Sequence, residues 1–452
     1  DAGRGRDRRG LGPQGRAMME LTAPQIGGLG VAVMLALCFA GVRFAFAAAI
    51  TGTAGLTMLI GWDAGIRTAG IVPYASGANY TLSVLPMFIL IGYLAYYAGI
   101  TQTAFEAARR WFGWLPGGLA TGTVFAVAGF SAVSGASSAA AAVFAKVAIP
   151  EMLRAGYNKR LAAGVCAAGA TLDSLIPPST LLVVYGIITE QSIGKLLIAG
   201  FVPGLISAVV YGVIITYRCW RQPDLGPRIT GYTWPQRFKA LPGTTPIFLV
   251  ILIIFFSMYF GWATPTEAGA LGAFAVFVFA LKNGIKPGEL RQCLLDSAKL
   301  TVMIFTVIWG VLIFVRFLGF SGLPEDVSKW VGELKVSPIW ILMAIYLMYF
   351  VLGTVLEGVG MFLLTLPIIF PIITALGYDP IWFGIVLVKL SGIASMSPPV
   401  GLVVFVVNGV RPDISVRDIF TGIWPFIFAD VVTLGILTAF PEIVTFITGA
   451  GD

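Results

Sequence analysis

Long apolar stretches separated by short polar ones run along nearly the whole chain. A helix needs about 20 mostly apolar residues to cross the hydrocarbon core of a bilayer. In the first half, stretches of this kind lie at 27–45, 46–62, 82–98, 161–189 and 196–217. Residues 250–256 and 362–373 are apolar on every face, unlike the alternating strands of an outer-membrane barrel. The pattern predicts an all-α polytopic membrane protein.

Residues 117–149 form a longer segment that is rich in glycine, alanine and serine. It exceeds the roughly 20–25 residues of one tilted span. Basic residues flank both of its ends, and the positive-inside rule places such flanks on the cytoplasmic side. A helical hairpin that enters and leaves the membrane on one side satisfies both observations. We predict one re-entrant hairpin here and a second at 338–370, where the flanks are mainly acidic.

Proline and glycine positions recur along the chain at a constant offset. Three pairs are each 221 residues apart: Pro150 with Pro371, Gly156 with Gly377, and Pro177 with Pro398. A shared offset of this kind indicates two homologous halves. The predicted organisation is a tail at 1–25, a first repeat at 26–217, a basic cytoplasmic linker at 218–240, a second repeat at 241–447 and a C-terminal tail at 448–452.

The charges predict that the two repeats have opposite orientations in the membrane. Basic residues flank the first hairpin, whereas Glu325, Asp326 and Glu333 precede the second. Each repeat must then cross the membrane an odd number of times, as five spans and one re-entrant hairpin do. Inverted repeats are the plan of many secondary transporters, which bind substrate and ions on broken helices near the membrane midplane.

Two proline pairs interrupt predicted spans. The first lies in LDSLIPPSTLL at 172–182, and its counterpart is SPPVG at 397–401. Proline lacks the amide proton and clashes with the preceding turn, so each pair should break its helix and free backbone carbonyls. Such carbonyls bind a small hard cation such as Na⁺, while new helix N-termini face a carboxylate. The alternative is a kink satisfied by serine hydroxyls and neighbouring helices.

The tips of both predicted hairpins combine small residues with hydroxyl or acidic groups. SAVSGASSAAAA at 131–142 forms the first tip, and LGTVLEGVGMF at 352–362 forms the second. Small residues let backbones approach closely, which serves helix packing as well as ligand binding. Two such tips beside two broken helices predict a transport site.

Composition narrows the function classes. Hydrophobic residues make up 58% and charged residues 11% of the chain, with a mean hydropathy of +0.90. The chain has no histidine, and its four cysteines lack metal-ligand spacing, so no transition-metal site is expected. It also lacks a phosphate-binding GxxxxGK(S/T) loop, and no spacing suggests a catalytic dyad, so we expect neither an ATPase nor another enzyme. Basic cytoplasmic loops explain the net charge of +7, so we expect no binding to nucleic acid.

From about residue 25 to its end the chain resembles the large permease subunit of tripartite ATP-independent periplasmic (TRAP) transporters. The resemblance rests on SGASSAAAA, IPEMLRAGYNKRLAAGVCAAGATLDSLIPPS, VYGIITEQSIGKLLIAGFVPG, LTLPIIFPIITALGYDPIWFG, SPPVG and the closing GIWPF. It implies an elevator-type importer in the lipid of the bacterial inner membrane. The import would be coupled to a sodium gradient. It also implies a small four-helix membrane subunit, a periplasmic binding protein and an organic acid as substrate. The runner-up is a stand-alone ion-coupled transporter of organic anions.

The resemblance assigns cation sites to the hairpin tips and helix breaks. The cation-site candidates are Ser134, Gly135, Ser137, Ser138, Ile176, Pro177, Ser179, Thr354, Glu357, Gly358, Ser397, Pro398 and Gly401. Substrate would bind between the sites, with Ser138, Asp173, Ser179, Lys389 and Ser395 as candidates. Na⁺ is the expected coupling ion, and no other cofactor is expected.

Several positions depart from the family pattern. Where this chain has Asp173 the family commonly has Gly, and where it has Glu357 the family commonly has Asp. The family also commonly has a Glu near the position of Gly392 and an Asn where this chain has Val403. Lys389 is also unexpected, because a charged side chain within a predicted span is costly unless a group of opposite charge pairs with it. We hypothesise that Lys389 pairs with Glu357 or Asp173 and thereby alters a cation site or holds an anionic substrate. The alternative is a side chain that reaches out to the membrane interface.

Two further segments are interpreted from their charges. Five arginines in residues 1–17 would hold the N-terminus inside, whereas the predicted spans place it outside. We therefore expect 1–17 to be an extension upstream of Met18 rather than part of the working protein. Segments 101–115 and 321–334 predict amphipathic interfacial helices, serving either as arms between a moving and a fixed domain or as simple anchors.

Overall fold

A computed structural model describes residues 21–134, 137–229, 231–334, 336–354 and 356–446. These ranges consist of helices and their connections, without a strand among them. The predicted extension at 1–17 and Gly135 of the first hairpin tip lie outside the described residues. The side chains of residues 131–139 are also not described.

Seven of the described helical segments are long and apolar enough to cross a membrane. They are Tyr80–Tyr97, Ile193–Arg221, Trp234–Tyr259, Pro265–Lys282, Pro287–Ser321, Gly358–Ala375 and Val416–Ala439. Six shorter apolar helices of 10–17 residues accompany them. The all-α polytopic fold class predicted from hydropathy is confirmed.

The first half contains five helices, a hairpin, a broken helix and a long final helix. The five helices are α1 (Ala23–Phe39), α2 (Phe44–Ile60), α3 (Trp62–Gly77), α4 (Val84–Tyr97) and α5 (Ile100–Phe112). The hairpin pairs α6 (Gly118–Ser134) with α7 (Ser137–Arg154). The broken helix consists of α8 (Lys159–Ala170) and α9 (Thr180–Thr189), and α10 (Ile193–Arg221) follows it.

The second half follows a short helix α11 (Trp234–Ala240) and repeats this order. Its first four helices are α12 (Thr245–Tyr259), α13 (Pro265–Lys282), α14 (Pro287–Ser321) and α15 (Leu323–Glu333). The hairpin is α16 (Pro338–Gly353) with α17 (Gly358–Ala375), and the broken helix is α18 (Pro380–Met396) with α19 (Leu402–Val410). The last elements are α20 (Val416–Ala439) and the short α21 (Glu442–Thr445).

Matching glycines end the second helix of each hairpin. Gly156 follows α7 with φ 82°, and Gly377 follows α17 with φ 81°. This left-handed conformation closes a helix end and costs glycine little, because glycine has no Cβ. The offset of 221 residues between the two positions therefore corresponds to the same chain reversal in both halves.

The sequence prediction missed helix α3. It placed only the spans 27–45, 46–62 and 82–98 before the first hairpin, whereas the chain forms an additional helix between the second and third. Asp63, Arg67 and Pro73 make α3 less apolar than a typical span. By the repeat offset, α3 and α4 together correspond to α14, which runs unbroken for 35 residues. In the first half the helix is interrupted at Asn79, whose side chain accepts the amide proton of Thr81.

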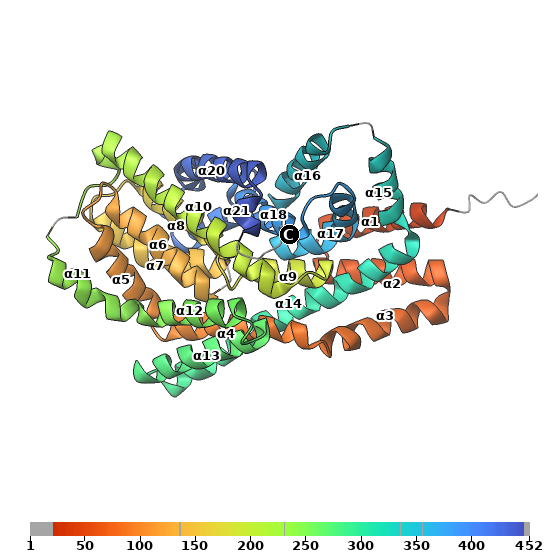
Figure 1. The fold of residues 1–452 in the computed structure, drawn as a ribbon, viewed down its shortest axis with the longest axis horizontal. Helices are drawn as coiled ribbons and strands as arrows, with labels where there is room; N and C mark the ends of the chain where they lie inside the picture. The colour runs from red at the N-terminus through yellow and green to blue at the C-terminus, as the bar shows by residue number, and fades with distance from the viewer. Residues whose placement is uncertain (1–20, 135–136, 230, 335, 355, 447–452) are drawn as a thin grey trace, which may run out of the picture.

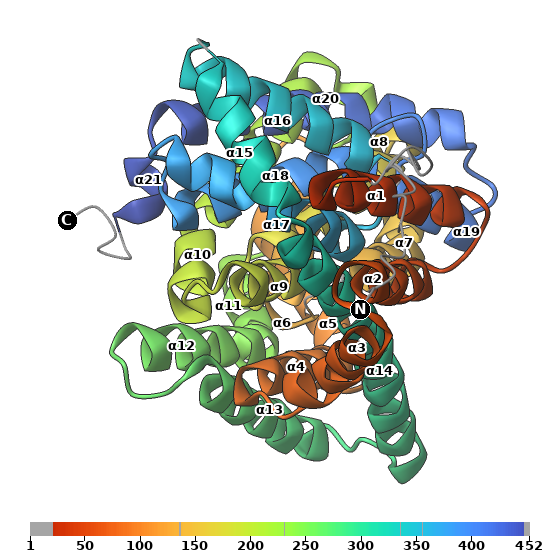
Figure 2. The same ribbon diagram turned by 90° about the vertical axis from the view of Figure 1, so that its right-hand side faces the viewer.

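In both views α4, α12 and α13 lie in the lower part of the protein and α18 and α20 in the upper part, with helices such as α9 between them (Figure 1, Figure 2). Helix α14 packs along α2 and α4 and also contacts α17 of the second hairpin. The broken helices pack on the final helices of the repeats, α8 on α20 and α18 on both α10 and α20. The first break is buried throughout, from residue 171 to residue 179, whereas Pro398 and Pro399 of the second break are exposed.

Helices α8 and α20 cross in backbone contact and link the two repeats. A Cβ added to Gly422 would lie 1.9 Å from the carbonyl oxygen of Arg160, and one added to Gly164 would lie 2.5 Å from the Gly422 backbone. At the start of both helices, Asp418 forms ion pairs with Lys159 at 2.7 Å and Arg160 at 2.8 Å. The crossing therefore has no room for a side chain at either glycine.

Candidate transport site

Both predicted helix breaks are present. Helix α8 stops at Ala170, one 3₁₀ turn (Thr171–Ser174) follows, and α9 begins only at Thr180. Helix α18 stops at Met396, and α19 begins at Leu402. Each gap contains its proline pair, whose missing amides and bulky rings account for the interruption.

Ser179 satisfies polar backbone groups on both sides of the first break. Its hydroxyl donates to the carbonyl of Ser174 and accepts the amide proton of Leu182 at 3.3 Å. Ser179 is thus the N-cap of α9, in a fully buried position. These contacts match the alternative of a break satisfied by a serine hydroxyl. A role of Ser179 as a cation ligand stays a prediction.

Replacing Ser179 by alanine is expected to destabilise the protein by about 2–3 kcal/mol, because it removes the N-cap and leaves the buried Ser174 carbonyl without a donor. Thermal unfolding of the purified variant measures this effect. Ser192→Ala is the matched control, since Ser192 caps α10 in the same way at an exposed position. If both substitutions lower the melting temperature equally, burial of the first cap is unimportant.

A cavity of about 200 Å³ lies where the first break, the second broken helix, the second hairpin and α14 meet. Its polar lining residues all come from the broken helices and the second hairpin: Asp173, Ser174, Ser179, Thr180, Glu357, Ser391 and Ser395. The same elements also contribute apolar residues, whereas the residues from α4 and α14 are all apolar: Ile89, Leu300, Met303, Ile304 and Val307. A concave space with a few converging polar groups and an apolar wall is typical of a small-molecule site.

The cavity brings together five of the predicted site residues: Asp173, Ser179, Glu357, Gly358 and Ser395. It is not lined by Ile176, Pro177, Thr354, Lys389, Ser397, Pro398 or Gly401. The hydroxyls of Thr354 and Ser397 donate to the carbonyls of Val351 and Ile393, at 2.8 and 2.7 Å. The assignments of Ser134, Ser137 and Ser138 stay predictions, because their side chains are not described.

The second hairpin packs directly against both broken helices, α9 and α18. A Cβ on Gly358 would lie 2.8 Å from the hydroxyl oxygen of Ser391 and 3.1 Å from Leu181. Ser391 also lines the cavity, although the sequence analysis did not select it. Its spacing was a usable signal, because Ser391 and Ser395 are four residues apart and therefore share one face of α18.

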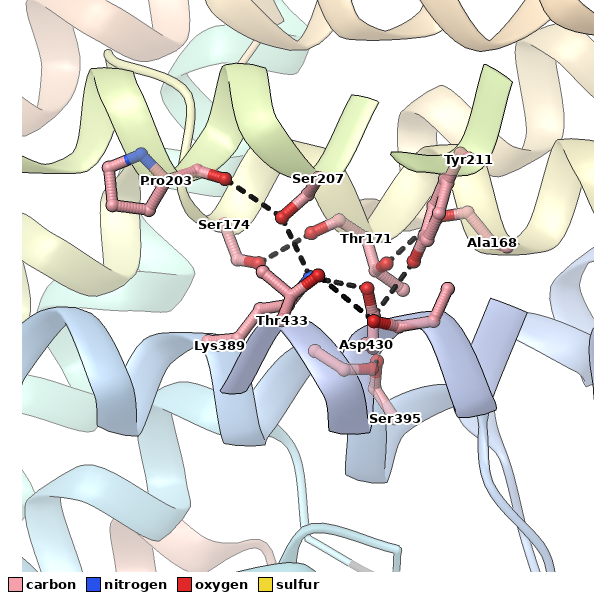
Figure 3. A network of polar contacts seen from close by, with 12 residues as sticks. Ala168, Thr171, Ser174, Pro203, Ser207, Tyr211, Lys389, Ser395, Asp430 and Thr433 are labelled. Carbon is pink, nitrogen blue, oxygen red and sulfur yellow. Dashed lines mark hydrogen bonds and ion pairs between the residues drawn. The ribbon is translucent and has the colours of Figure 1, made fainter. Parts of the chain in front are cut away.

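Lys389 lies in a buried polar network between α10, α18 and α20 (Figure 3). Its ammonium forms an ion pair with Asp430 of α20 at 2.5 Å and a hydrogen bond with Ser207 of α10 at 3.0 Å. The hydroxyl of Tyr211 donates to the second carboxylate oxygen of Asp430 at 2.7 Å. The Lys389 and Asp430 side chains are 4% and 1% exposed. The network thus joins α10 of the first repeat to α18 and α20 of the second.

This geometry corrects the hypothesis about Lys389. The lysine pairs with Asp430 rather than with Glu357 or Asp173, and it does not reach the membrane interface. Lys389 was also predicted to be a substrate ligand, but its side chain points into the α10–α20 interface and does not line the cavity. Sequence reasoning overlooked Asp430, although an acid in the middle of the apolar span Val416–Ala439 is itself a charge that needs a partner.

Comparison with known proteins gives the family. The tripartite ATP-independent periplasmic transporter family, DctM component, matches residues 28–443. The chain belongs to this family. It is therefore a TRAP large permease, a multi-pass protein of the bacterial inner membrane.

Two relatives and one solved structure illustrate the similarity. The C4-dicarboxylate TRAP transporter large permease protein DctM of Pseudomonas aeruginosa is 36% identical over 363 residues, or 78% of this chain and 83% of that one. The sialic acid TRAP transporter large permease protein SiaM of Vibrio cholerae is 29% identical over 90% of this chain and 95% of that one. The YdaH transporter of Alcanivorax borkumensis has a TM-score of 0.64 at 13% identity, covering 93% of this chain and 99% of that one, and so shares the fold.

Proposed function

We propose that this TRAP large permease imports a small organic acid by sodium-coupled, elevator-type transport. In this proposal a small four-helix membrane subunit completes the membrane part, and a periplasmic binding protein delivers the substrate. The observation that carries the proposal is the cavity beside the first helix break, whose polar residues all come from the broken helices and the second hairpin and whose α14 residues are all apolar. The names of the two relatives, which refer to C4-dicarboxylate and sialic acid, support an organic acid as the substrate class.

The charges of the cavity support coupling to a cation. Asp173 and Glu357 both line it, so an organic anion would meet two carboxyl groups. A sodium ion bound between these groups and the substrate reverses the repulsion, and each ligand then strengthens the binding of the other. Hydroxyl and carbonyl oxygens, which hard cations prefer, are available at the breaks. The hydroxyl of Ser395, for example, donates to the Gly392 carbonyl at 2.8 Å and leaves its own oxygen able to coordinate a cation.

The two faces of the cavity support elevator movement. The broken helices and the second hairpin contribute every polar lining residue, and α4 and α14 contribute only apolar side chains. A polar layer slides along an apolar wall without breaking hydrogen bonds to it. The interfacial helices α5 and α15 precede the two hairpins, the positions that arms between a moving and a fixed domain would take.

Replacing Glu357 by glutamine is expected to weaken apparent sodium affinity about tenfold, because one charged oxygen ligand in the protein contributes on the order of 1–2 kcal/mol. Sodium dependence of uptake in proteoliposomes measures the change. Glu333→Gln removes the same charge from an exposed position on α15 and should leave sodium dependence unaltered. An unchanged sodium dependence in Glu357→Gln would remove Glu357 from the proposed cation site.

Uptake into proteoliposomes tests the function as a whole. The large permease is reconstituted with its small subunit, and candidate organic acids are supplied on purified binding proteins. Uptake should require an inward sodium gradient and the loaded binding protein. Equal uptake with potassium in place of sodium would contradict sodium coupling. Uptake of free substrate by this chain alone would identify a stand-alone transporter instead.

A further inference from the structure

A second cavity, of about 380 Å³, lies apart from the transport site between α5, α6, α10 and α12. Alanine, aliphatic and aromatic side chains make up nearly all of its lining. It extends from Thr244, the N-cap of α12, to Ile251, about two helical turns, and its wall includes Ile176 beside the first proline pair. A long, apolar space among membrane helices has the shape and chemistry that suit a hydrocarbon chain.

One end of this cavity lies beside arginines. Trp111, which lines the cavity, donates its indole proton to the carbonyl of Arg237 at 3.1 Å. The guanidinium of Arg237 stacks on the Trp234 ring at 4.8 Å, and Arg110 contacts the Gln236 carbonyl at 3.5 Å. The end of the cavity at Trp111 therefore lies next to the positively charged linker.

Arg237 differs from the two arginines of α5 at this end of the cavity in having no ion pair. Arg109 and Arg110 form ion pairs with Glu106, and Arg109 also pairs with Glu151. Among the described residues no carboxylate forms an ion pair with Arg237, and its buried Nε lacks a hydrogen-bond acceptor. A guanidinium with a free donor is suited to a phosphate oxygen. Basic residues beside cytoplasmic ends of spans also attract anionic lipids.

We propose that this cavity binds one anionic phospholipid, with an acyl chain along α12 and the phosphate at Arg237. The apolar lining selects the hydrocarbon chain, and the uncompensated guanidinium selects a negative headgroup. An acyl chain in this position contacts α5, α12 and Ile176 at the same time. The lipid would thus join the interfacial helix to the first helix break without entering the transport cavity.

Native mass spectrometry of the purified transporter tests lipid binding directly. The protein is delipidated in detergent and then titrated with phosphatidylglycerol, with phosphatidylcholine of the same acyl chains, or with glycerol phosphate. We expect one phosphatidylglycerol per chain to be retained, with much weaker retention of phosphatidylcholine and no retention of glycerol phosphate. Equal retention of the two phospholipids would overturn the proposal, because it would show no role for the headgroup charge.

Two pairs of variants assign binding to this cavity. Leu205→Trp fills it from α10 and should weaken retention about tenfold, through loss of buried apolar contact. Leu252→Trp is its control, because Leu205 and Leu252 are 48% and 49% exposed and only Leu205 lines the cavity. Arg237→Gln should weaken retention about fivefold, whereas the same charge removal at exposed Arg291 should not.

Unchanged retention in both Leu205→Trp and Arg237→Gln would also overturn the proposal. Arg237→Gln alters a half-buried side chain on the short helix α11, so it remains informative if the larger tryptophan disturbs folding. The readout is lipid mass bound per chain, which does not depend on substrate, sodium or a binding protein. Failure of this site is therefore distinguishable from failure of the proposed transport function.

Discussion

Replacing Lys389 by methionine is expected to lower the free energy of unfolding by about 3–5 kcal/mol, because the buried carboxylate of Asp430 then loses its cation. The remaining hydrogen bond from Tyr211 does not neutralise that charge. The double variant Lys389→Met/Asp430→Leu should regain most of the lost stability, since apolar residues often replace a buried ion pair without a net cost. Thermal unfolding of the purified variants measures both effects.

A complete double-mutant cycle separates the interaction from the two individual changes. Lys239→Met makes the same substitution at an exposed position in the linker and should leave the melting temperature unchanged. A Lys389→Met protein as stable as the wild type would show that the ion pair contributes nothing to folding. Uptake by the stable double variant then tests whether transport needs the charges themselves or only a packed interface.

Replacing Gly422 by valine is expected to destabilise the fold by at least about 3 kcal/mol, at the upper end of overpacking effects. The added Cβ would lie 1.9 Å from the carbonyl oxygen of Arg160. This oxygen belongs to the backbone, so no change of side-chain rotamer can relieve the clash. The two helices must separate, which also disturbs the ion pairs of Asp418. We expect a marked loss of monodisperse protein in size-exclusion chromatography and a lower melting temperature.

Gly435→Val provides the matched control on the same helix. Gly435 also lies within α20, but a Cβ there meets nothing within 4 Å. Both substitutions change helix propensity equally, so their difference reports the crossing of α8 and α20. Equal stability of the two variants would mean that the helices separate easily at this crossing.

The main architecture follows from local features of the sequence. The proline pairs at 177–178 and 398–399 break their helices wherever the chain packs, because the missing amides and ring clashes are properties of proline itself. The offset of 221 residues predicted a repeated order of elements for the same reason. Helix α3 escaped prediction, because packing against α2 compensates for the charges and proline that lower its apolar character.

The polar contacts of the site depend on tertiary packing and were harder to predict. Lys389 and Asp430 are 41 residues apart, and no sequence pattern specifies which face of α18 meets α20. The two acids considered as partners, Asp173 and Glu357, instead line the cavity. Repeat symmetry predicts which hairpin tips and helix breaks lie together better than it predicts side-chain pairs.

The position of α20 has a consequence for biosynthesis. This helix supplies Asp418 to the start of α8, and it supplies Asp430 to Lys389 and Tyr211. Synthesis proceeds from the N-terminus, so α8, α10 and α18 are all made before their partner helix exists. During that interval Lys389 has no counter-ion from Asp430 and must be sheltered by the insertion machinery or by water. The last long helix therefore completes the assembly of both halves at once.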